Sequence, residues 1–334
     1  MKPRPSRWSV IDSVLEARFA ADWETIWPEG TPVGLAVSGG PDSLGLLLLA
    51  QSVLPGSFMV ATVDHGLRPE SAAEAQDVAS LCLKLGIRHD ILTIALQRGP
   101  ALQERARNAR YAALGQWAVR NGLTAIATAH HADDQAETLL MRLSRGAGLR
   151  GLASMRSRSP LPGQSECTLL RPLLGWRRSD LAGIVAKARI VPGRDPSNTD
   201  LRFERARMRI ELSSLKELDA LAVAASARHL AEADAAIEWM ARRCVSAVRA
   251  EAGIRYWDPG DVPKVVALRV LERITGDLGA EKPRGNALAR WHDRLRAGGI
   301  ATLAGVRGDG RKAEWRFALA PKPRYASDSV TGRP

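Results

Sequence analysis

Two hydrophobic patterns alternate along the first two-thirds of the chain. Short apolar runs bounded by turn residues predict buried strands at 33–37, 58–63, 88–94 and 124–128. Between them, helical spacing of apolar residues predicts helices at 43–53, 70–85, 102–121 and 133–145. This order of elements predicts an α/β fold, a doubly wound, Rossmann-like parallel sheet with helices on both faces. Ligands of such sheets bind at the carboxyl ends of the strands.

The rest of the chain reads as mainly helical. A polar loop is predicted at 154–165, a last strand at 168–174, a helix at 177–188 and an irregular segment at 191–202. Further helices are predicted at 215–250, 262–278 and 286–297, and short strands at 301–306 and 314–319. We therefore expect an N-terminal helical extension (1–29), a catalytic domain (30–212), a smaller, mainly helical C-terminal domain (213–320) and a disordered tail (321–334).

Composition narrows the class of protein. The 334 residues are 45% hydrophobic and 25% charged, which is typical of a globular protein. The chain contains no run of 18 apolar residues, and residues 1–19 lack the apolar core of a secretory signal, so neither a membrane span nor secretion is expected. The three cysteines stand far apart and form no CxxC pair. A reducing, cytoplasmic location is the expectation.

The formal net charge of +12 suggests a polyanionic partner, with nucleic acid first in line. Only 8 of the 48 basic residues are Lys. Such an excess of Arg over Lys can also reflect the base composition of the genome rather than a function of the protein. The distribution favours function, because residues 140–210 hold 15 basic and 5 acidic residues, a net of +10. We expect an anion-binding region there.

A glycine-rich turn joins the first predicted strand to the first predicted sheet helix. Glycines let backbone N–H groups approach a phosphate closely, and a helix N-terminus attracts anions. An aspartate suits such a turn if Mg²⁺ lies between it and the phosphate. No Gly-Lys-Ser/Thr follows, so this is not a Walker A loop. The alternative is a plain turn with Asp42 as the helix cap. The predicted phosphate-binding residues are Ser38, Gly39, Gly40, Pro41, Asp42 and Ser43.

A second polar cluster, HHADDQAET at 130–138, follows the fourth predicted strand. Asp133 or Asp134 is expected to cap the helix that begins there. Asp134, Glu137 and Thr138 then share one helix face. Two carboxylates on that face can hold a metal ion or a primary ammonium group. A zinc site is a weak alternative because the HExxH spacing is absent, and an exposed capping box is the other alternative.

Four arginines occur within eight residues, at Arg202, Arg205, Arg207 and Arg209. On a helix, Arg202, Arg205 and Arg209 form one stripe. Like charges on one stripe repel each other unless an anion sits there, and phosphate groups would serve. The alternative is a solvated helix face.

The string SGGPDS resembles the signature of the N-type ATP pyrophosphatases, or PP-loop family, which split ATP between the α and β phosphates. Together with HHADDQAET it makes the chain similar to the tRNA(Ile)-lysidine synthase family. Further segments match that family in order: 63–68 (VDHGLR), 106–111 (ARNARY), 145–152 (RGAGLRGL), 171–174 (RPLL), 195–198 (DPSN) and 205–209 (RARMR). The match covers about residues 30–215. Ala206 departs from it, since the family often has Asn there.

The resemblance implies an enzyme that joins free L-lysine to C2 of the wobble cytidine in a tRNA(Ile) with anticodon CAU. ATP is consumed to AMP and pyrophosphate through an adenylated cytidine. It implies ATP and Mg²⁺ as cofactors, Asp42 as the magnesium ligand, and Asp134 and Glu137 as lysine-binding and catalytic acids. We further predict Arg110 and Arg205 as catalytic residues, Asp64, His65 and Arg145 as ATP contacts, and Arg202, Arg207 and Arg209 as contacts of tRNA or phosphate. His65, which follows the second predicted strand, fits a loop residue with no role equally well. A homodimer is also implied, with one C-terminal domain fewer than the longest members.

Three rival functions fit parts of the sequence. A tRNA-thiolating PP-loop enzyme would need cysteines for an iron–sulfur cluster or a persulfide, and three isolated cysteines count against it. A small-molecule synthetase of the amidotransferase type would not need the basic segment. A tRNA-binding module that has lost catalysis would not need intact Ser38, Asp42, Ser43, Asp134 and Glu137.

Overall fold

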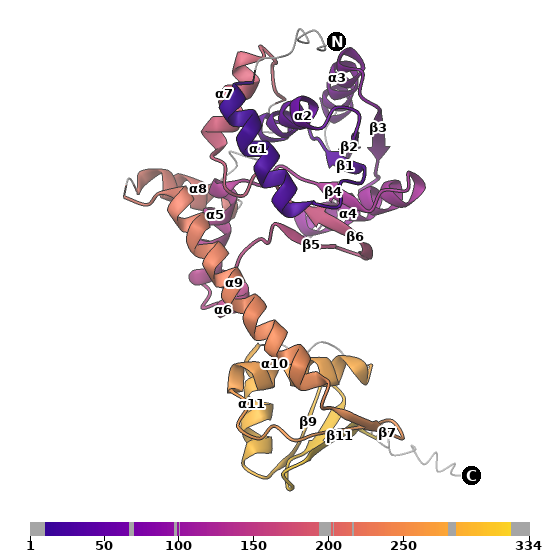
Figure 1. Cartoon of the computed structure of the whole chain (residues 1–334), viewed down its shortest axis with the longest axis vertical. Coiled ribbons are helices and arrows are strands. Elements are labelled where there is room, and N and C mark those ends of the chain that lie inside the picture. The colour runs from indigo at the N-terminus through magenta and orange to yellow at the C-terminus, as the bar shows by residue number, and fades with distance from the viewer. Residues whose placement is uncertain are drawn as a thin grey trace, which may run out of the picture. The chain divides into compact units, whose positions relative to one another are not determined.

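The computed structural model describes residues 11–66, 70–96, 99, 101–193, 202, 204–215, 217–279 and 285–321 (Figure 1). The chain divides into two compact units, Met1–Ala231 and Glu232–Pro334. The first unit contains a mostly parallel sheet with helices, and the second contains an antiparallel sheet with helices. None of the helices in the described ranges has the length and apolar character needed to cross a membrane.

The first unit alternates strands and helices as the hydrophobic pattern predicts. After α1 (Ser13–Ile26), the order is β1 (Val33–Ala36), α2 (Pro41–Val53), β2 (Phe58–Asp64), α3 (Glu70–Leu85), β3 (His89–Thr93), α4 (Leu102–Arg120), β4 (Ala125–Ala127) and α5 (Ala132–Leu143). Then follow α6 (Leu149–Leu152), β5 (Arg158–Leu161), β6 (Gln164–Leu170), α7 (Arg178–Lys187) and α8 (Glu204–Ser214). The long helix α9 (Ala220–Val245) begins in this unit and ends in the second.

The sheet of the first unit has the strand order β3-β2-β1-β4-β6-β5. All neighbours are parallel except β5, which runs antiparallel to β6. The chain proceeds from β1 to one edge and then returns to place β4 on the other side of β1, where Leu35 pairs with Ala127. The strand order therefore reverses between β1 and β4. Ligands of open α/β sheets bind outside the carboxyl ends of the strands at such a point.

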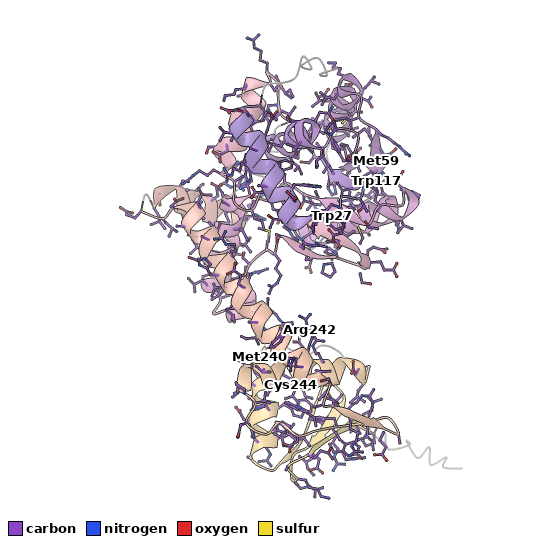
Figure 2. All side chains as sticks on the ribbon, viewed as in Figure 1. Trp27, Met59, Trp117, Met240, Arg242 and Cys244 are labelled. Atoms are coloured by element: carbon purple, nitrogen blue, oxygen red, sulfur yellow. The ribbon has the colours of Figure 1, made fainter. Side chains whose placement is uncertain are left out.

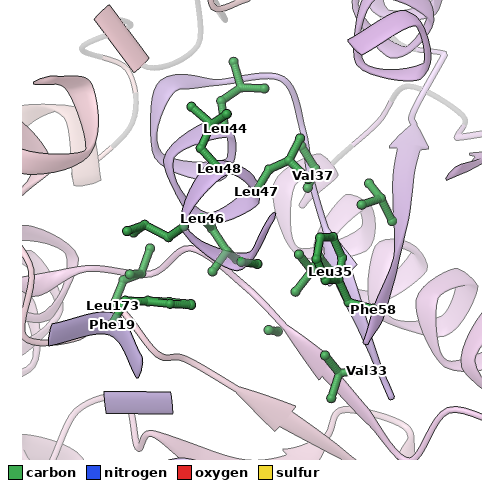
Figure 3. Packing of buried hydrophobic residues seen from close by; sticks show 14 of the residues in the cluster. Phe19, Val33, Leu35, Val37, Leu44, Leu46, Leu47, Leu48, Phe58 and Leu173 are labelled. Atoms are coloured by element: carbon green, nitrogen blue, oxygen red, sulfur yellow. The ribbon is translucent and has the colours of Figure 1, made fainter. Parts of the chain in front are cut away.

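Helices cover both faces of this sheet. On one face, α1, α2, α3 and α7 share a core with β1 and β2, and α2 supplies a continuous apolar run, Leu44 and Leu46–Leu49, because it packs between the sheet and neighbouring helices (Figure 3). On the other face, α4 contributes Tyr111, Leu114 and Trp117. Trp117 belongs to this second cluster and Met59 packs against it; both are labelled in Figure 2. The doubly wound α/β fold predicted from the sequence is confirmed.

The segment 154–165, predicted as a loop, instead contains strand β5 and the turn of a hairpin. Gly163 has φ +79° at the turn, a conformation that favours glycine. The pairing of β5 with β6 shifts register between Pro160 and Leu161. Proline is tolerated in a sheet at such a bulge on an edge strand. The Ser and Pro content of this segment concealed the strand from sequence analysis.

The second unit combines helices with a five-stranded antiparallel sheet, ordered β7-β8-β11-β10-β9. Its elements are β7 (Arg249–Glu251), β8 (Ile254–Trp257), α10 (Lys264–Asp277), α11 (Gly285–Arg296), β9 (Ile300–Leu303), β10 (Val306–Asp309) and β11 (Trp315–Leu319). The single strand predicted at 301–306 is in fact the end of β9, a turn at Ala304-Gly305 and the start of β10. Trp257, Trp291 and Trp315 lie in the core, and Cys244, labelled in Figure 2, packs against it. Strands β7 and β8 were not predicted.

The domain boundaries predicted from sequence differ from the division into compact units. The boundary between 212 and 213 lies near the end of α8, whereas the two units divide within α9. Of the predicted N-terminal extension, α1 packs into the main core through Phe19 and Trp23. The predicted disordered tail lies outside the described residues beyond residue 321.

Close approach of α4 to β1 requires glycine at position 34. A Cβ built on Gly34 would lie 2.3 Å from Trp117 Cζ3. We expect Gly34→Ala to lower the free energy of unfolding of the first unit by about 1–3 kcal/mol through overpacking, measured by urea denaturation. Gly183→Ala is the control, because a Cβ there meets nothing within 4 Å and alanine favours the helix. Equal stability of the Gly34→Ala variant and the parent protein would contradict this account of the packing.

Candidate active site

A tight turn joins β1 to α2. Gly39 has φ +83°, and a Cβ on it would approach Val78 Cγ2 to 3.2 Å, so both backbone conformation and space favour glycine. Gly40 is the N-cap of α2, and Pro41 occupies the first turn, where its missing N–H costs nothing. No side chain in the described part of the chain caps this helix. The first-turn amides of Asp42 and Ser43 therefore remain available to an anion.

Hydrogen bonds within the turn fix its shape. Ser43 Oγ donates to Gly40 O over 3.0 Å and accepts from Ser38 N over 3.1 Å. The hydroxyls of Ser38 and Ser43 are 3.3 Å apart. In addition, Gly193 N donates to Gly39 O over 2.9 Å. The loop is thus held open around its N–H groups, as phosphate binding requires.

The second motif begins where β4 ends. The residue at the N-cap position of α5 is His131, not Asp133 or Asp134 as predicted, and α5 starts one residue earlier than expected. His131 N donates to Asp134 Oδ2 over 3.1 Å, which fixes the Asp134 carboxylate at the start of the helix. Asp133 turns the other way: its Oδ2 accepts from Arg178 N over 2.9 Å, at the start of α7. The two aspartates therefore have separate roles.

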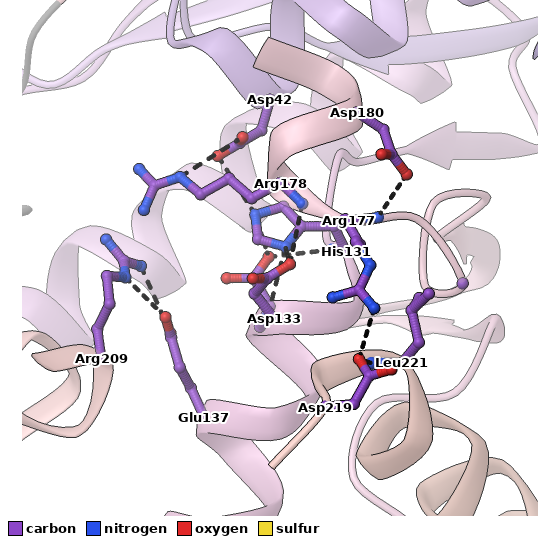
Figure 4. A network of polar contacts seen from close by, with 12 residues as sticks. Asp42, His131, Asp133, Glu137, Arg177, Arg178, Asp180, Arg209, Asp219 and Leu221 are labelled. Carbon is purple, nitrogen blue, oxygen red and sulfur yellow. Dashed lines mark hydrogen bonds and ion pairs between the residues drawn. The ribbon is translucent and has the colours of Figure 1, made fainter. Parts of the chain in front are cut away.

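The His131 ring joins the two motifs across the point where the strand order reverses (Figure 4). Its Nε2 lies 3.5 Å from Asp42 Oδ2 and 3.6 Å from Asp134 Oδ2, and its Nδ1 lies 3.4 Å from Asp133 Oδ2. Burial alone would lower the pKa of His131, but its hydrogen bonds to Asp133 and Asp42 and the charge of Asp134 raise it to about 9. The ring is thus an imidazolium at neutral pH. In this protonated ring Nδ1 donates toward Asp133 and cannot accept from Asp134 N, which lies 3.4 Å away.

Asp134 and Glu137 form ion pairs with two arginines of α8. Arg205 Nη2 lies 2.6 Å from Asp134 Oδ1, and Arg205 Nε lies 2.6 Å from Glu137 Oε2. Arg209 Nε lies 2.7 Å from Glu137 Oε1. The Glu137 side chain is only 2% exposed. The anions beside the predicted arginine stripe are therefore carboxylates of the protein itself.

The stripe is shorter than the sequence predicts. Arg202 precedes α8 and lies in a turn, so Arg205 and Arg209 alone share the helix face. Arg202 and Arg207 are exposed, and Arg207 Nη1 donates to Arg202 O over 3.1 Å.

A group of cations surrounds His130. Burial holds the pKa of His130 well below its usual value, and the charges of nearby arginines lower it further, so the ring is neutral. Thr128 Oγ1 and His130 Nδ1 are 2.8 Å apart. Burial also lowers the pKa of the Arg110 guanidinium, which lies 5.3 Å from the Tyr111 ring. The arginines whose charges act on His130 are Arg171, Arg110, Arg205 and Arg107.

Other predicted residues lie further from this group or contact their own loops. Asp64 ends β2, and its Oδ1 accepts from Ser71 Oγ over 2.6 Å and from Gly66 N over 2.9 Å. These hydrogen bonds lower the Asp64 pKa. His65 follows it, half-buried. Arg145 lies beyond the far end of α5, and that end, Leu143, is roughly 18 Å along the helix from His131 at 1.5 Å per residue. Arg145 forms an ion pair with Glu204.

The contacts of three residues at this site were not predicted. His131 and Asp133 belong to the quoted motif, yet the sequence assigned no role to His131 and only a helix cap to Asp133. Arg178 Nε lies 3.9 Å from Asp42 Oδ1, but Arg178 stands 136 positions away in the chain. The pair of adjacent histidines, His130 and His131, was the feature of the sequence that could have indicated a role for His131. The segments 67–69 and 194–201, which include parts of two matched motifs, lie outside the described residues.

The fold and the loop define an ATP-binding α/β protein of the PP-loop type, and the PP-loop domain family matches residues 13–216. A tRNA(Ile)-lysidine synthase from Novosphingobium aromaticivorans is 58% identical over 309 residues, covering 92% of this chain and 94% of that one. Another, from Zymomonas mobilis, is 41% identical over 306 residues, covering 90% and 92%. The chain belongs to the tRNA(Ile)-lysidine synthase family, and it is an ATP-binding, tRNA-modifying ligase.

A solved structure of more distant sequence shares the fold. The U34-tRNA thiolase NcsA from Methanococcus maripaludis aligns with a TM-score of 0.54 at 14% identity, covering 66% of this chain and 80% of that one. This likeness supports the PP-loop architecture of the first unit.

The imidazolium of His131 makes stability depend on pH. Because its folded pKa is raised to about 9, its contribution is complete below pH 6.5 and is lost as pH rises through 9. We expect the stability difference between the parent protein and His131→Gln to shrink by up to about 3 kcal/mol across that range. Urea denaturation in chelator-treated buffer measures it. The exposed His229→Gln serves as control, and a difference that is constant with pH would refute the imidazolium.

Proposed function

We propose that the enzyme joins free L-lysine to C2 of the wobble cytidine of tRNA(Ile) with anticodon CAU, with ATP converted to AMP and pyrophosphate through an adenylated cytidine. The lysidine formed would change codon reading from AUG to AUA and charging from methionine to isoleucine. The names of the relatives support the substrate. The observation that carries the proposal is that the His131 ring contacts both Asp42 of the phosphate loop and Asp134, one of the two carboxylates proposed to bind lysine.

The first half of the reaction is activation of the cytidine. The C2 oxygen is a poor leaving group until it is adenylated, and negative charge then develops on the departing pyrophosphate. The backbone amides of Asp42 and Ser43, which no side-chain cap occupies, would stabilise that charge. Arg110 belongs to the cationic group around His130 and would stabilise the same charge. We assign Asp64, His65 and Arg145 to ATP contacts, as predicted from the sequence.

The residues present fit a magnesium ion at Asp42. Asp42 Oδ1 is buried and accepts no hydrogen bond from the described residues. No group of three or more His, Cys, Asp or Glu side chains in those residues is arranged to hold a metal ion. Mg²⁺ usually binds through one or two carboxylates while phosphates and water supply the other ligands. Asp42 would hold it, and the ion would neutralise charge on the phosphates of ATP.

The second half is attack by lysine. The free ε-amine has a pKa of about 10.4, so at neutral pH it arrives protonated. The site must bind this cation and then remove a proton, and carboxylates at hydrogen-bond distance do both. Asp134 and Glu137 lie one helical turn apart with their carboxylates bridged by one guanidinium, so one ammonium group can contact both. Arg205, which bridges them, holds their geometry.

Binding of tRNA draws on exposed cations. Arg202 and Arg207 are exposed at the start of α8 and suit phosphate contacts. Arg209, assigned to phosphate from sequence, instead binds Glu137 in this structure. A homodimer stays a prediction.

Lysine incorporation tests this function. With ATP, Mg²⁺ and labelled lysine, we expect label in the tRNA(Ile) transcript with a CAU anticodon, AMP release, and no label in the methionine tRNA that shares the anticodon. Asp42→Asn and Asp134→Asn should each lower turnover by at least about a hundredfold, with tRNA still bound. Asp77→Asn, an exposed acid of α3, is the control.

Each other outcome has a definite meaning. AMP release without lysine transfer would keep the ATP pyrophosphatase and exclude lysine as the nucleophile. Salt-dependent tRNA binding without AMP would make the chain a binding module. Near-normal turnover in either aspartate variant would remove that residue from the mechanism.

A further inference from the structure

The two carboxylates proposed to receive lysine are already paired with cations of the protein. Glu137 has a guanidinium nitrogen within hydrogen-bond distance of each carboxylate oxygen, from Arg205 at 2.6 Å and Arg209 at 2.7 Å. Asp134 has Arg205 on one oxygen and the His131 backbone N–H on the other. Each of these carboxylate oxygens therefore already accepts a hydrogen bond from the protein before an ammonium group arrives.

Charge balance favours the departure of a guanidinium. Asp134 and Glu137 carry two negative charges, and Arg205 and Arg209 carry two positive ones, while the His131 imidazolium also has Asp42 and Asp133 as partners. Adding a lysine ammonium while both arginines stay would leave one uncompensated positive charge beside the buried Glu137, which is costly. Removing one arginine as lysine enters restores neutrality. Glu137, at 2% exposure, is paired throughout such an exchange.

Arg209 is the partner that leaves at the lower cost. Arg205 bridges both carboxylates with two short contacts, so its departure would expose charge on Asp134 and Glu137 together. Arg209 contacts Glu137 alone, through Nε at 2.7 Å and a longer Nη2 contact of 3.5 Å. Figure 4 shows Arg209 approaching Glu137 from the side of α8, away from the His131 group. An ammonium at the place of Arg209 Nε would make the same hydrogen bond.

The helix that carries Arg209 is held largely by charge. Among the described side chains of α8, Ala206 alone is buried. Leu212, partly buried, packs against a small cluster with Ala136 and Leu139 of α5. Ion pairs also link α8 to neighbouring elements, of Glu204 with Arg145 and of the two arginines with α5. Release of the Arg209 side chain therefore disturbs little apolar packing.

We propose that Arg209 is an internal placeholder for the substrate ammonium group, which pairs with Glu137 in the empty enzyme and is displaced by the amine of lysine. This inference rests on the proposed function, since it takes Asp134 and Glu137 as the lysine site. Arg209 then keeps a buried acid compensated before substrate arrives. It also sets how strongly the enzyme binds lysine, because every binding event breaks the Arg209–Glu137 pair.

Removal of the placeholder should tighten binding, a result that structural damage would not produce. We expect Arg209→Gln to lower the dissociation constant for labelled L-lysine by about tenfold in equilibrium dialysis without tRNA. The KM for lysine should fall with it. Arg209→Lys should stay within about twofold of the parent, because its ammonium still pairs with Glu137 and reaches at least as far as the arginine Nε. Arg120→Gln makes the same charge change at the far end of α4 and should leave lysine affinity unaltered.

The outcomes separate this inference from the proposed function. Unchanged or weaker lysine binding by Arg209→Gln, with binding abolished by Glu137→Gln, would overturn the placeholder and keep the lysine site. If Arg209→Gln and Arg120→Gln both bind lysine more tightly, the placeholder is also overturned, because the change in the protein's net charge would then account for the tighter binding. Normal lysine binding by Glu137→Gln would remove the lysine site itself, and the placeholder with it.

Discussion

A buried carboxylate must be paired, and Glu137 imposes this constraint on the whole site. Its side chain is 2% exposed and projects from α5 into a region where water cannot compensate its charge. Arg205 and Arg209 of α8 compensate this charge, and their ion pairs hold the arginine-rich helix against α5. A site built in this way recognises a cation of the substrate by exchanging it for a cation of the protein.

The sheet topology brings this group to the phosphate loop. The loop follows β1 and the acidic helix follows β4, and these strands are neighbours at the point where the strand order reverses. His131, buried and positively charged, spans the gap between Asp42 and the acids of α5. The residues proposed for nucleotide activation and those proposed for amine capture therefore meet around one imidazolium ring. This arrangement suits a reaction in which an adenylated base is attacked by an amine.

The sequence predicts much of this and misses the rest for physical reasons. Periodicity located the strands and helices of the first unit, because its parallel strands are buried and its helices amphipathic or apolar. It missed β5, where Ser and Pro on an edge strand imitate a loop. The motifs indicated the acids and the loop, but not their partners: the Arg178–Asp42 and Arg209–Glu137 contacts join residues distant in the chain. The spacing of the arginines also suggested that an external anion lies beside them. Spacing along one helix cannot reveal that the carboxylates of α5 are the anions.

The most direct measurement is a structure of the enzyme with L-lysine and an ATP analogue that cannot be cleaved between its α and β phosphates. The account predicts the ε-ammonium of lysine within hydrogen-bond distance of Glu137 and Asp134, the guanidinium of Arg205 still bridging them, and the Arg209 side chain turned away. Lysine bound elsewhere, with both arginines unmoved on Glu137, would contradict it.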